Sequence, residues 1–196
     1  TSPILIDKKE CWNELKQICT DLKLNNAEAT ERCGGHIHIG SQVLKNDVNC
    51  YKNFLKLWYV YEEIMYRFST GEDTKIRRAA KQYAKSLRPY MDNQKWKIST
   101  MHNEDELRLV LLRFTSDRYK AVNFSNTKYI KHKNFNTIEF RCPNGTIEEV
   151  IWQNNVNTFM NFANYAASNN FDKEFIDHQF KCDEERNIKY FYFMDI

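Results

Sequence analysis

Glycine and proline are scarce in this sequence, and long apolar runs are absent. Only 5 of the 196 residues are glycine and 3 are proline, so we expect little irregular structure and treat each glycine as informative. No apolar run reaches membrane-spanning length, so we expect no membrane partner. The formal net charge is only +3, from 29 basic and 26 acidic side chains, which is too small an excess to indicate nucleic acid as a partner.

Closely spaced cysteines are also missing. The six cysteines are scattered without a Cys-x-x-Cys motif, and a chain with 42% hydrophobic residues has enough core to fold without disulfides. We therefore expect reduced thiols and a cytoplasmic location. The chain starts at Thr1 rather than at methionine, and Ile4–Ile6 reads as the end of a strand, so we expect further residues upstream; a signal peptide there stays open.

Hydrophobic spacing predicts one α+β unit without repeats, linkers or low-complexity segments. We predict helices over residues 7–24, 47–68, 75–87, 104–114 and 147–168 and from residue 171 onward, and strands over residues 4–6, 33–41, 119–125 and 136–142. Asp7 and Asp47 are the expected N-caps of the first two helices. Glu62 and Glu63 interrupt the aromatic second helix, and the sequence leaves open whether one faces a cleft or both face solvent.

The segment Gly-Gly-His-Ile-His-Ile-Gly is the first candidate for a functional site. Side chains two apart on a strand share a face, so His36 and His38 lie together on one face and Ile37 and Ile39 on the other. We expect the isoleucines to be buried and the imidazoles to face a polar cavity. The flanking glycines allow a ligand or another backbone to approach closely. An exposed or structurally bonded histidine pair is the simpler alternative.

A second strand repeats this arrangement. Glu139 and Arg141 share a face with Thr137, while Ile138 and Phe140 share the other. Two such strands predict a half-covered antiparallel sheet whose polar face is a site. The alternative is an ion pair between Glu139 and Arg141 with no further role.

Three segments, in this order, resemble the signature of the amidoligase family, which comprises carboxylate–amine ligases similar to glutamine synthetase. They are Cys33–Gly40, the Arg-Tyr-Lys-Ala-Val-Asn run 118–123, and Thr137–Arg141 with its continuation Cys-Pro-Asn-Gly-Thr. The resemblance covers about residues 1–168. It implies a glutamine-synthetase-like antiparallel sheet with one face a polar cleft and helices packed on the other. It also implies a catalytic domain over residues 1–170, lacking its N-terminal part, and a C-terminal helix and tail over residues 171–196.

The resemblance assigns metal and nucleotide roles to four positions. His36 and Glu139 match metal ligands of the family, and His38 matches a histidine that reaches the nucleotide phosphates. Asn123 matches a polar residue that positions the nucleotide. Mg²⁺ prefers oxygen ligands, whereas a mixed imidazole and carboxylate shell also suits Mn²⁺. The implied cofactors are ATP and Mg²⁺ or Mn²⁺.

The resemblance also implies the reaction, which is ATP-dependent formation of an amide or isopeptide bond through an acyl phosphate. The substrates would be a small-molecule or peptide carboxylate and an amine. Arg141 matches the arginine that holds the carboxylate or acyl phosphate, and Arg118 resembles an arginine that contacts phosphate. A planar guanidinium binds two oxygens at once, which suits both tasks.

One part of the family pattern is missing from these residues. The family carries metal-binding glutamates in a Glu-x-Glu strand and another glutamate just before the segment that matches Ser2–Leu5, so we expect these residues alone to be incomplete for activity. Two other functions stay open. One is a metal-dependent hydrolase using His36, His38 and Glu139. The other is a module that binds nucleic acid through the basic, tyrosine-containing stretches 75–85 and 128–133. The sequence predicts neither the substrates nor the oligomeric state.

Overall fold

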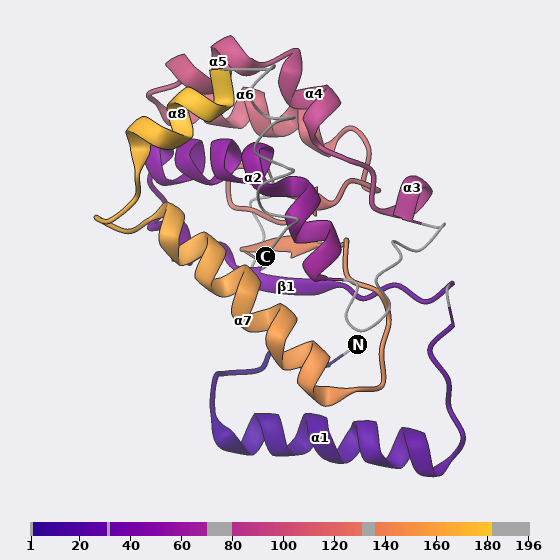
Figure 1. The fold of residues 1–196 in the computed structure, drawn as a ribbon. Coiled ribbons are helices and arrows are strands. Elements are labelled where there is room, and N and C mark those ends of the chain that lie inside the picture. The colour runs from indigo at the N-terminus through magenta and orange to yellow at the C-terminus, as the bar shows by residue number, and fades with distance from the viewer. Residues whose placement is uncertain (1, 31, 70–79, 131–135, 182–196) are drawn as a thin grey trace.

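A computed structural model of the protein describes residues 2–30, 32–69, 80–130 and 136–181. It confirms the α+β class, with a small antiparallel sheet and helices packed mainly on one side of it (Figure 1). The elements are, in chain order, α1 (Lys9–Leu24), β1 (Ile37–Gly40), the 3-10 helix η1 (Ser41–Leu44), α2 (Val48–Phe68), α3 (Ala80–Tyr83), α4 (Arg88–Asp92), α5 (Lys95–Thr100), α6 (Glu104–Thr115), β2 (Val122–Asn123), β3 (Thr137–Phe140), α7 (Glu149–Ala166) and α8 (Lys173–Lys181).

The sheet has the strand order β1-β3-β2, and both pairings are antiparallel. The register places Glu139, in the central strand, opposite His38 on one side and opposite Asn123 on the other. An isolated bridge between Gly34 and Asn144 continues the contact between the two segments beyond the regular strands. The sheet therefore aligns three predicted site residues in one row.

The other face of the sheet forms part of the hydrophobic core. Ile37, Ile39, Ile138 and Phe140 are all buried there, as the alternation of the two strands predicted. Phe140 stacks on Phe159 of α7, with ring centroids 4.2 Å apart.

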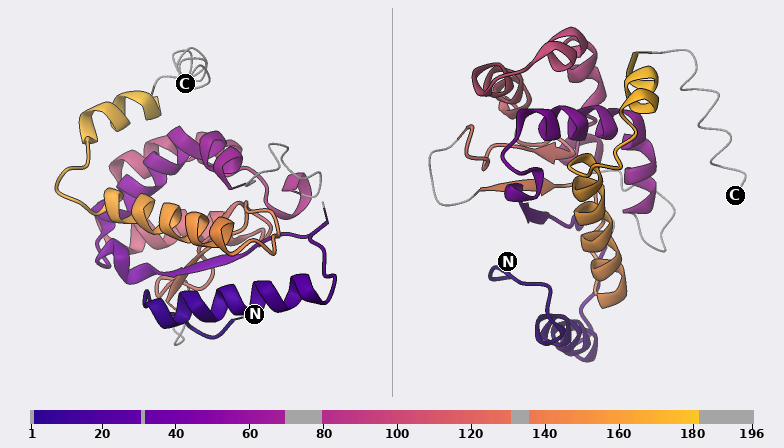
Figure 2. Two further views of the ribbon diagram at one scale, coloured as in Figure 1. Left: turned by 60° about the horizontal axis from the view of Figure 1, so that its bottom comes forward. Right: turned by 90° about the vertical axis from the view of Figure 1, so that its left-hand side faces the viewer.

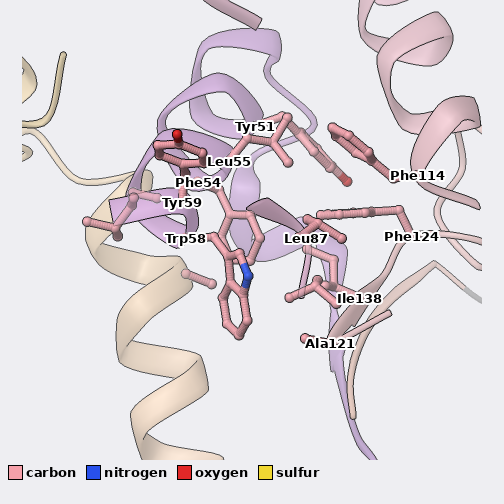
Figure 3. Packing of buried hydrophobic residues seen from close by; sticks show 14 of the residues in the cluster. Tyr51, Phe54, Leu55, Trp58, Tyr59, Leu87, Phe114, Ala121, Phe124 and Ile138 are labelled. Carbon is pink, nitrogen blue, oxygen red and sulfur yellow. The ribbon is translucent and has the colours of Figure 1, made fainter. Parts of the chain in front are cut away.

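Helix α2 supplies the largest side chains of this core. Phe54 and Trp58 contact Phe140 with ring centroids 6.1 and 5.7 Å away, and Figure 3 shows both among the strand and loop residues that they cover. Tyr51, on the same helix, is also fully buried, whereas Tyr61 is half-buried. The core thus fixes the sheet from one side and leaves its polar face to the site.

The predicted caps are confirmed for one helix and wrong for another. Asp47 caps α2, because its carboxylate accepts hydrogen bonds from the backbone N–H groups of Asn49 and Cys50. Asp7 does not cap α1, whose N-cap is Lys8. The Asp7 carboxylate instead accepts a hydrogen bond from the Trp12 indole. In α6, Leu107, Val110 and Leu111 are all buried.

Helix α1 has few neighbours in the fold. It lies beside the N-terminal end of α7, apart from the layer formed by α2, α5 and α6 (Figures 1 and 2). Lys23 pairs with Glu148 at this junction, with Nζ 2.7 Å from Oε2. The helix predicted over residues 7–24 is confirmed, and two of its apolar residues, Ile18 and Leu22, are exposed.

Several predicted boundaries need correction. Residues 4–6 form no strand and are exposed. The predicted helix over residues 75–87 lies outside the described residues up to position 79, and its described part is helical only in α3. Beyond α3, the N–H of Lys85 donates to the carbonyl of Tyr119 and its carbonyl accepts from Ala121, which holds this segment extended. The predicted strand over residues 119–125 is reduced to β2, and those over 33–41 and 136–142 to β1 and β3.

Glu62 takes neither of the two positions that the sequence left open. It is buried, and its carboxylate accepts hydrogen bonds from the Trp58 indole at 2.8 Å, the Leu87 N–H at 2.6 Å and the Ser86 hydroxyl. These bonds anchor the start of α4, a short helix that the sequence did not predict, as it also missed α5. No helix among the described residues is long and apolar enough to cross a membrane.

Candidate active site on the polar face of the sheet

The Glu139 carboxylate is the centre of a cluster formed by predicted site residues. Its Oε1 accepts a hydrogen bond from Arg141 Nη1 at 2.6 Å and lies 3.3 Å from His36 Nδ1 and 3.7 Å from His38 Nε2. Its Oε2 accepts a hydrogen bond from Asn123 Nδ2 at 2.9 Å. The side chain of Glu139 is only 8% exposed, whereas the two imidazoles are 42% and 41% exposed. The cluster therefore has a buried acidic centre and a histidine rim open to solvent.

Neighbouring groups orient two members of this cluster, Asn123 and His38. The side-chain oxygen Oδ1 of Asn123 accepts a hydrogen bond from the backbone N–H of Ser125, which turns the side-chain nitrogen Nδ2 towards Glu139. His38 Nδ1 lies 3.3 Å from the Thr137 hydroxyl, so Nε2 faces the carboxylate. An imidazole oriented through its second nitrogen is typical of metal-binding and catalytic histidines.

Two glycines allow the two motif segments to approach each other. The Gly35 N–H donates to the carbonyl of Pro143, and a Cβ at Gly35 would lie 2.6 Å from a ring carbon of Trp152. A Cβ at Gly145 would lie 2.6 Å from the Cβ of Cys33. Of the two explanations for the glycines of the first motif, the structure supports close packing of backbone and side chain at Gly35. This packing fixes the position of β1 relative to β3.

Arg141 is held at three points around its guanidinium group. Besides the bond to Glu139, its Nε donates to the carbonyl of Tyr83 at 3.1 Å, and its Cζ lies 5.8 Å from the centroid of the Tyr119 ring. The ion pair between Glu139 and Arg141 that the sequence left open is thus present. It occurs together with the histidine and asparagine contacts, so it is part of a larger cluster.

Arg118, the last of the predicted residues, is placed against Tyr119. It is exposed, its Nη2 donates to the Tyr119 hydroxyl at 2.8 Å, and its Cζ lies 4.9 Å from the Tyr119 ring centroid. Tyr119 therefore connects Arg118 to Arg141. The sequence predicts a strand at Tyr119 but no role for its side chain, because the motif does not indicate that the ring contacts two guanidinium groups.

The sequence also did not predict a structural role for Lys120, next to Tyr119. It is fully buried, and its Nζ donates to the carbonyls of Phe114 at 2.8 Å and Arg113 at 3.1 Å, at the C-terminal end of α6. Burial lowers the pKa of Lys120 to about 8. Lys85 and Asp117 form an ion pair of 2.8 Å nearby, and their hydrogen bond lowers the pKa of the Asp117 carboxyl and raises that of Lys85. These groups anchor the segment that leads into β2.

The donor chemistry of the cluster, with two imidazoles beside one carboxylate, suits a divalent cation. The described residues contain no group of three or more histidine, cysteine, aspartate or glutamate side chains placed to hold an ion. His36 Nδ1 and His38 Nε2 nevertheless both lie within 3.7 Å of the same oxygen, Glu139 Oε1. The Arg141 guanidinium is paired with this same oxygen, Glu139 Oε1, so a metal cation would compete with Arg141 for it.

The basic stretches proposed as a nucleic-acid surface add little to this picture. Positions 70–79 and 131–135 lie outside the described residues, which removes much of both stretches from view. Lys85, in the remaining part, is engaged with Asp117.

Comparison with known proteins gives one match. A family model described as "Putative amidoligase enzyme" matches residues 1–163, a range that contains all six predicted site residues. No curated protein and no solved structure matches the chain.

Proposed function

The chain belongs to the putative amidoligase enzymes, and from this premise we propose that it is an ATP-dependent carboxylate–amine ligase that forms an amide or isopeptide bond through an acyl phosphate. The observation that carries the proposal is the convergence of His36, His38, Asn123 and Arg141 on the single carboxylate of Glu139. We interpret the three-stranded sheet as the inner part of a glutamine-synthetase-like cleft, with this cluster on its polar face.

The reaction needs a carboxylate to be activated before an amine attacks it. Phosphoryl transfer depends mainly on positioning and on neutralising the charge of the phosphates. In the proposed site Arg141 binds the substrate carboxylate, because its planar guanidinium pairs with two oxygens at once. Arg118, exposed at the edge of the cluster, binds phosphate, and His38 reaches the nucleotide phosphates from the opposite strand.

The metal in this proposal is Mg²⁺ or Mn²⁺, held by His36 and Glu139. When bound, it neutralises negative charge on the transferring phosphate. Asn123 keeps Glu139 in place through its hydrogen bond to Oε2, which leaves Oε1 directed at the histidines. Because Arg141 pairs with this same Oε1, the proposal requires the guanidinium to shift from Glu139 to the substrate.

The test is an assay for ADP and trapped acyl phosphate on the full-length protein. Amino acids and short peptides serve as carboxylate donors, and hydroxylamine serves as the amine, since it converts acyl phosphates to hydroxamates that iron(III) reveals. We expect ADP and hydroxamate in equal amounts, dependent on Mg²⁺ or Mn²⁺.

Two variants connect this activity with the site. Glu139→Gln should lower the rate about 100-fold or more, as expected for a residue that acts on the transition state. Glu63→Gln is the matched control, because Glu63 also pairs with an arginine, Arg88, but lies exposed on α2; it should keep the rate within twofold. Release of product from an ester or amide without ATP would contradict the ligase and support a metal-dependent hydrolase.

A further inference from the structure

Tyr119 contacts both arginines of the proposed site. Its hydroxyl accepts a hydrogen bond from Arg118 at 2.8 Å, and its ring lies under the same guanidinium with Cζ 4.9 Å from the centroid. The guanidinium of Arg141 lies 5.8 Å from the same centroid. A cation within about 6 Å of an aromatic ring is attracted by the ring's electrons, so one tyrosine interacts with two cations.

The ring itself is held in place from several sides. The Tyr119 N–H donates to the Asp117 carboxylate at 2.9 Å, and its carbonyl accepts from the Lys85 N–H at 2.6 Å. Asp117 and Lys85 are in turn joined by their own ion pair. The ring of Tyr83 meets that of Tyr119 edge-on, with centroids 5.2 Å apart. Tyr119 is therefore a fixed support between α3 and β2.

The two arginines depend on this support to different degrees. Arg141 is also bonded to Glu139 and to the carbonyl of Tyr83. Arg118 is exposed, and within the described residues its hydrogen bond is the one to the Tyr119 hydroxyl. A long exposed side chain loses considerable rotamer entropy when it is ordered, so a preformed position favours ligand binding.

We propose that Tyr119 is a positioning residue, whose hydroxyl holds Arg118 ordered before substrate binds and whose ring supports Arg141 when that guanidinium shifts from Glu139 to the substrate. The proposal rests on the proposed ligase function. Under it, Arg118 serves the phosphate and Arg141 the carboxylate, so the hydroxyl and the ring of one side chain affect different substrates.

Two substitutions separate these contributions. Tyr119→Phe removes the hydroxyl and keeps the ring, so KM for ATP should rise about three- to tenfold, the equivalent of one hydrogen bond, while KM for the carboxylate changes less than twofold. Tyr119→Leu removes the ring as well, so KM for the carboxylate should also rise several-fold. Tyr90→Phe is the matched control and should change neither constant more than twofold, because the cation over the Tyr90 ring is Lys120, to which the proposed site assigns no substrate. Equal kinetics for Tyr119→Phe and Tyr90→Phe would overturn the proposal.

A second measurement does not depend on enzymatic activity. In ¹⁵N NMR spectra, the relaxation of each arginine Nε–H reports how well its side chain is ordered, with Arg118→Lys and Arg141→Lys supplying the assignments. We expect Arg118 to be ordered in the unchanged protein and to become as mobile as Arg108, an exposed arginine on α6, in Tyr119→Phe. Arg141 should stay ordered in that variant because of its bond to Glu139.

The two measurements separate failure of this proposal from failure of the ligase function. If the unchanged protein forms no ADP with any carboxylate, the ligase function fails, and the relaxation data still decide whether Tyr119 orders Arg118. If the protein is active but Arg118 is already as mobile as Arg108, the positioning role is refuted while the ligase function stands.

Discussion

A double-mutant cycle on Glu139 and Arg141 tests whether the centre of the site is partly buried. The two side chains are 8% and 11% exposed and meet at 2.6 Å. Removing one partner of such a pair leaves a poorly solvated charge, so Glu139→Gln and Arg141→Gln should each lower the free energy of unfolding by about 3 kcal/mol. In the double variant neither charge is left unpaired, so we expect a coupling energy of about 2 kcal/mol.

The control cycle uses Glu63 and Arg88, which form an ion pair of 2.9 Å in which Glu63 is 56% exposed. An exposed pair of this kind contributes about 0.2–1 kcal/mol. Both cycles are measured by urea denaturation at neutral pH, with one set of four proteins for each pair. A coupling between Glu139 and Arg141 no larger than that of the control pair would refute the conclusion that the acidic centre is shielded from water.

Three further predictions concern the framework around the site. Gly35→Ala should lower the free energy of unfolding, measured in urea, by about 1–3 kcal/mol, because the added Cβ meets Trp152 at 2.6 Å. Adding Trp152→Leu should restore much of this lost stability. If it restores none, the packing argument is contradicted. Lys120, whose pKa is lowered to about 8 from 10.5, binds fewer protons when folded than when unfolded between these values, so its contribution to stability should rise with pH. Relative to Lys120→Met, the free energy of unfolding should increase by about 2 kcal/mol from pH 8 to 9.5, and parallel curves would contradict the lowered pKa. Asp47→Ala should lower the free energy of unfolding by about 1 kcal/mol, because it removes the cap of α2. Asp7→Ala removes no cap, so it should lower this free energy less when the two variants are compared by thermal unfolding.

The sequence predicted which side chains share a face of each strand, and the structure confirms these faces. Alternation with period two is a local property, so it correctly placed His36 with His38 and Glu139 with Arg141. The sequence alone could not show that Glu139 lies in the central strand with Asn123 on its far side. That register depends on pairing between residues far apart in the chain, which local spacing does not encode.

The residues that were missed take their roles from distant partners. Glu62 binds the backbone at Leu87, and Lys120 binds the carbonyls that end α6, so neither burial follows from the surrounding sequence. A charged residue within an aromatic or basic segment usually faces solvent, and here the hydrogen bonds of the fold reverse that expectation. The short helices α4 and α5 span too few residues for an apolar period to be recognised.

Addition of Mn²⁺ followed by proton NMR of the histidine rings tests the central claim most directly, since this paramagnetic ion broadens the signals of nearby protons. If His36 and Glu139 hold a divalent cation, the ring signals of His36 and His38 should broaden at Mn²⁺ concentrations that leave the exposed His102 and His178 sharp, and Glu139→Gln should remove this difference. Equal broadening of these four of the five histidines, or a pattern unchanged in Glu139→Gln, would contradict a metal site on the polar face of the sheet.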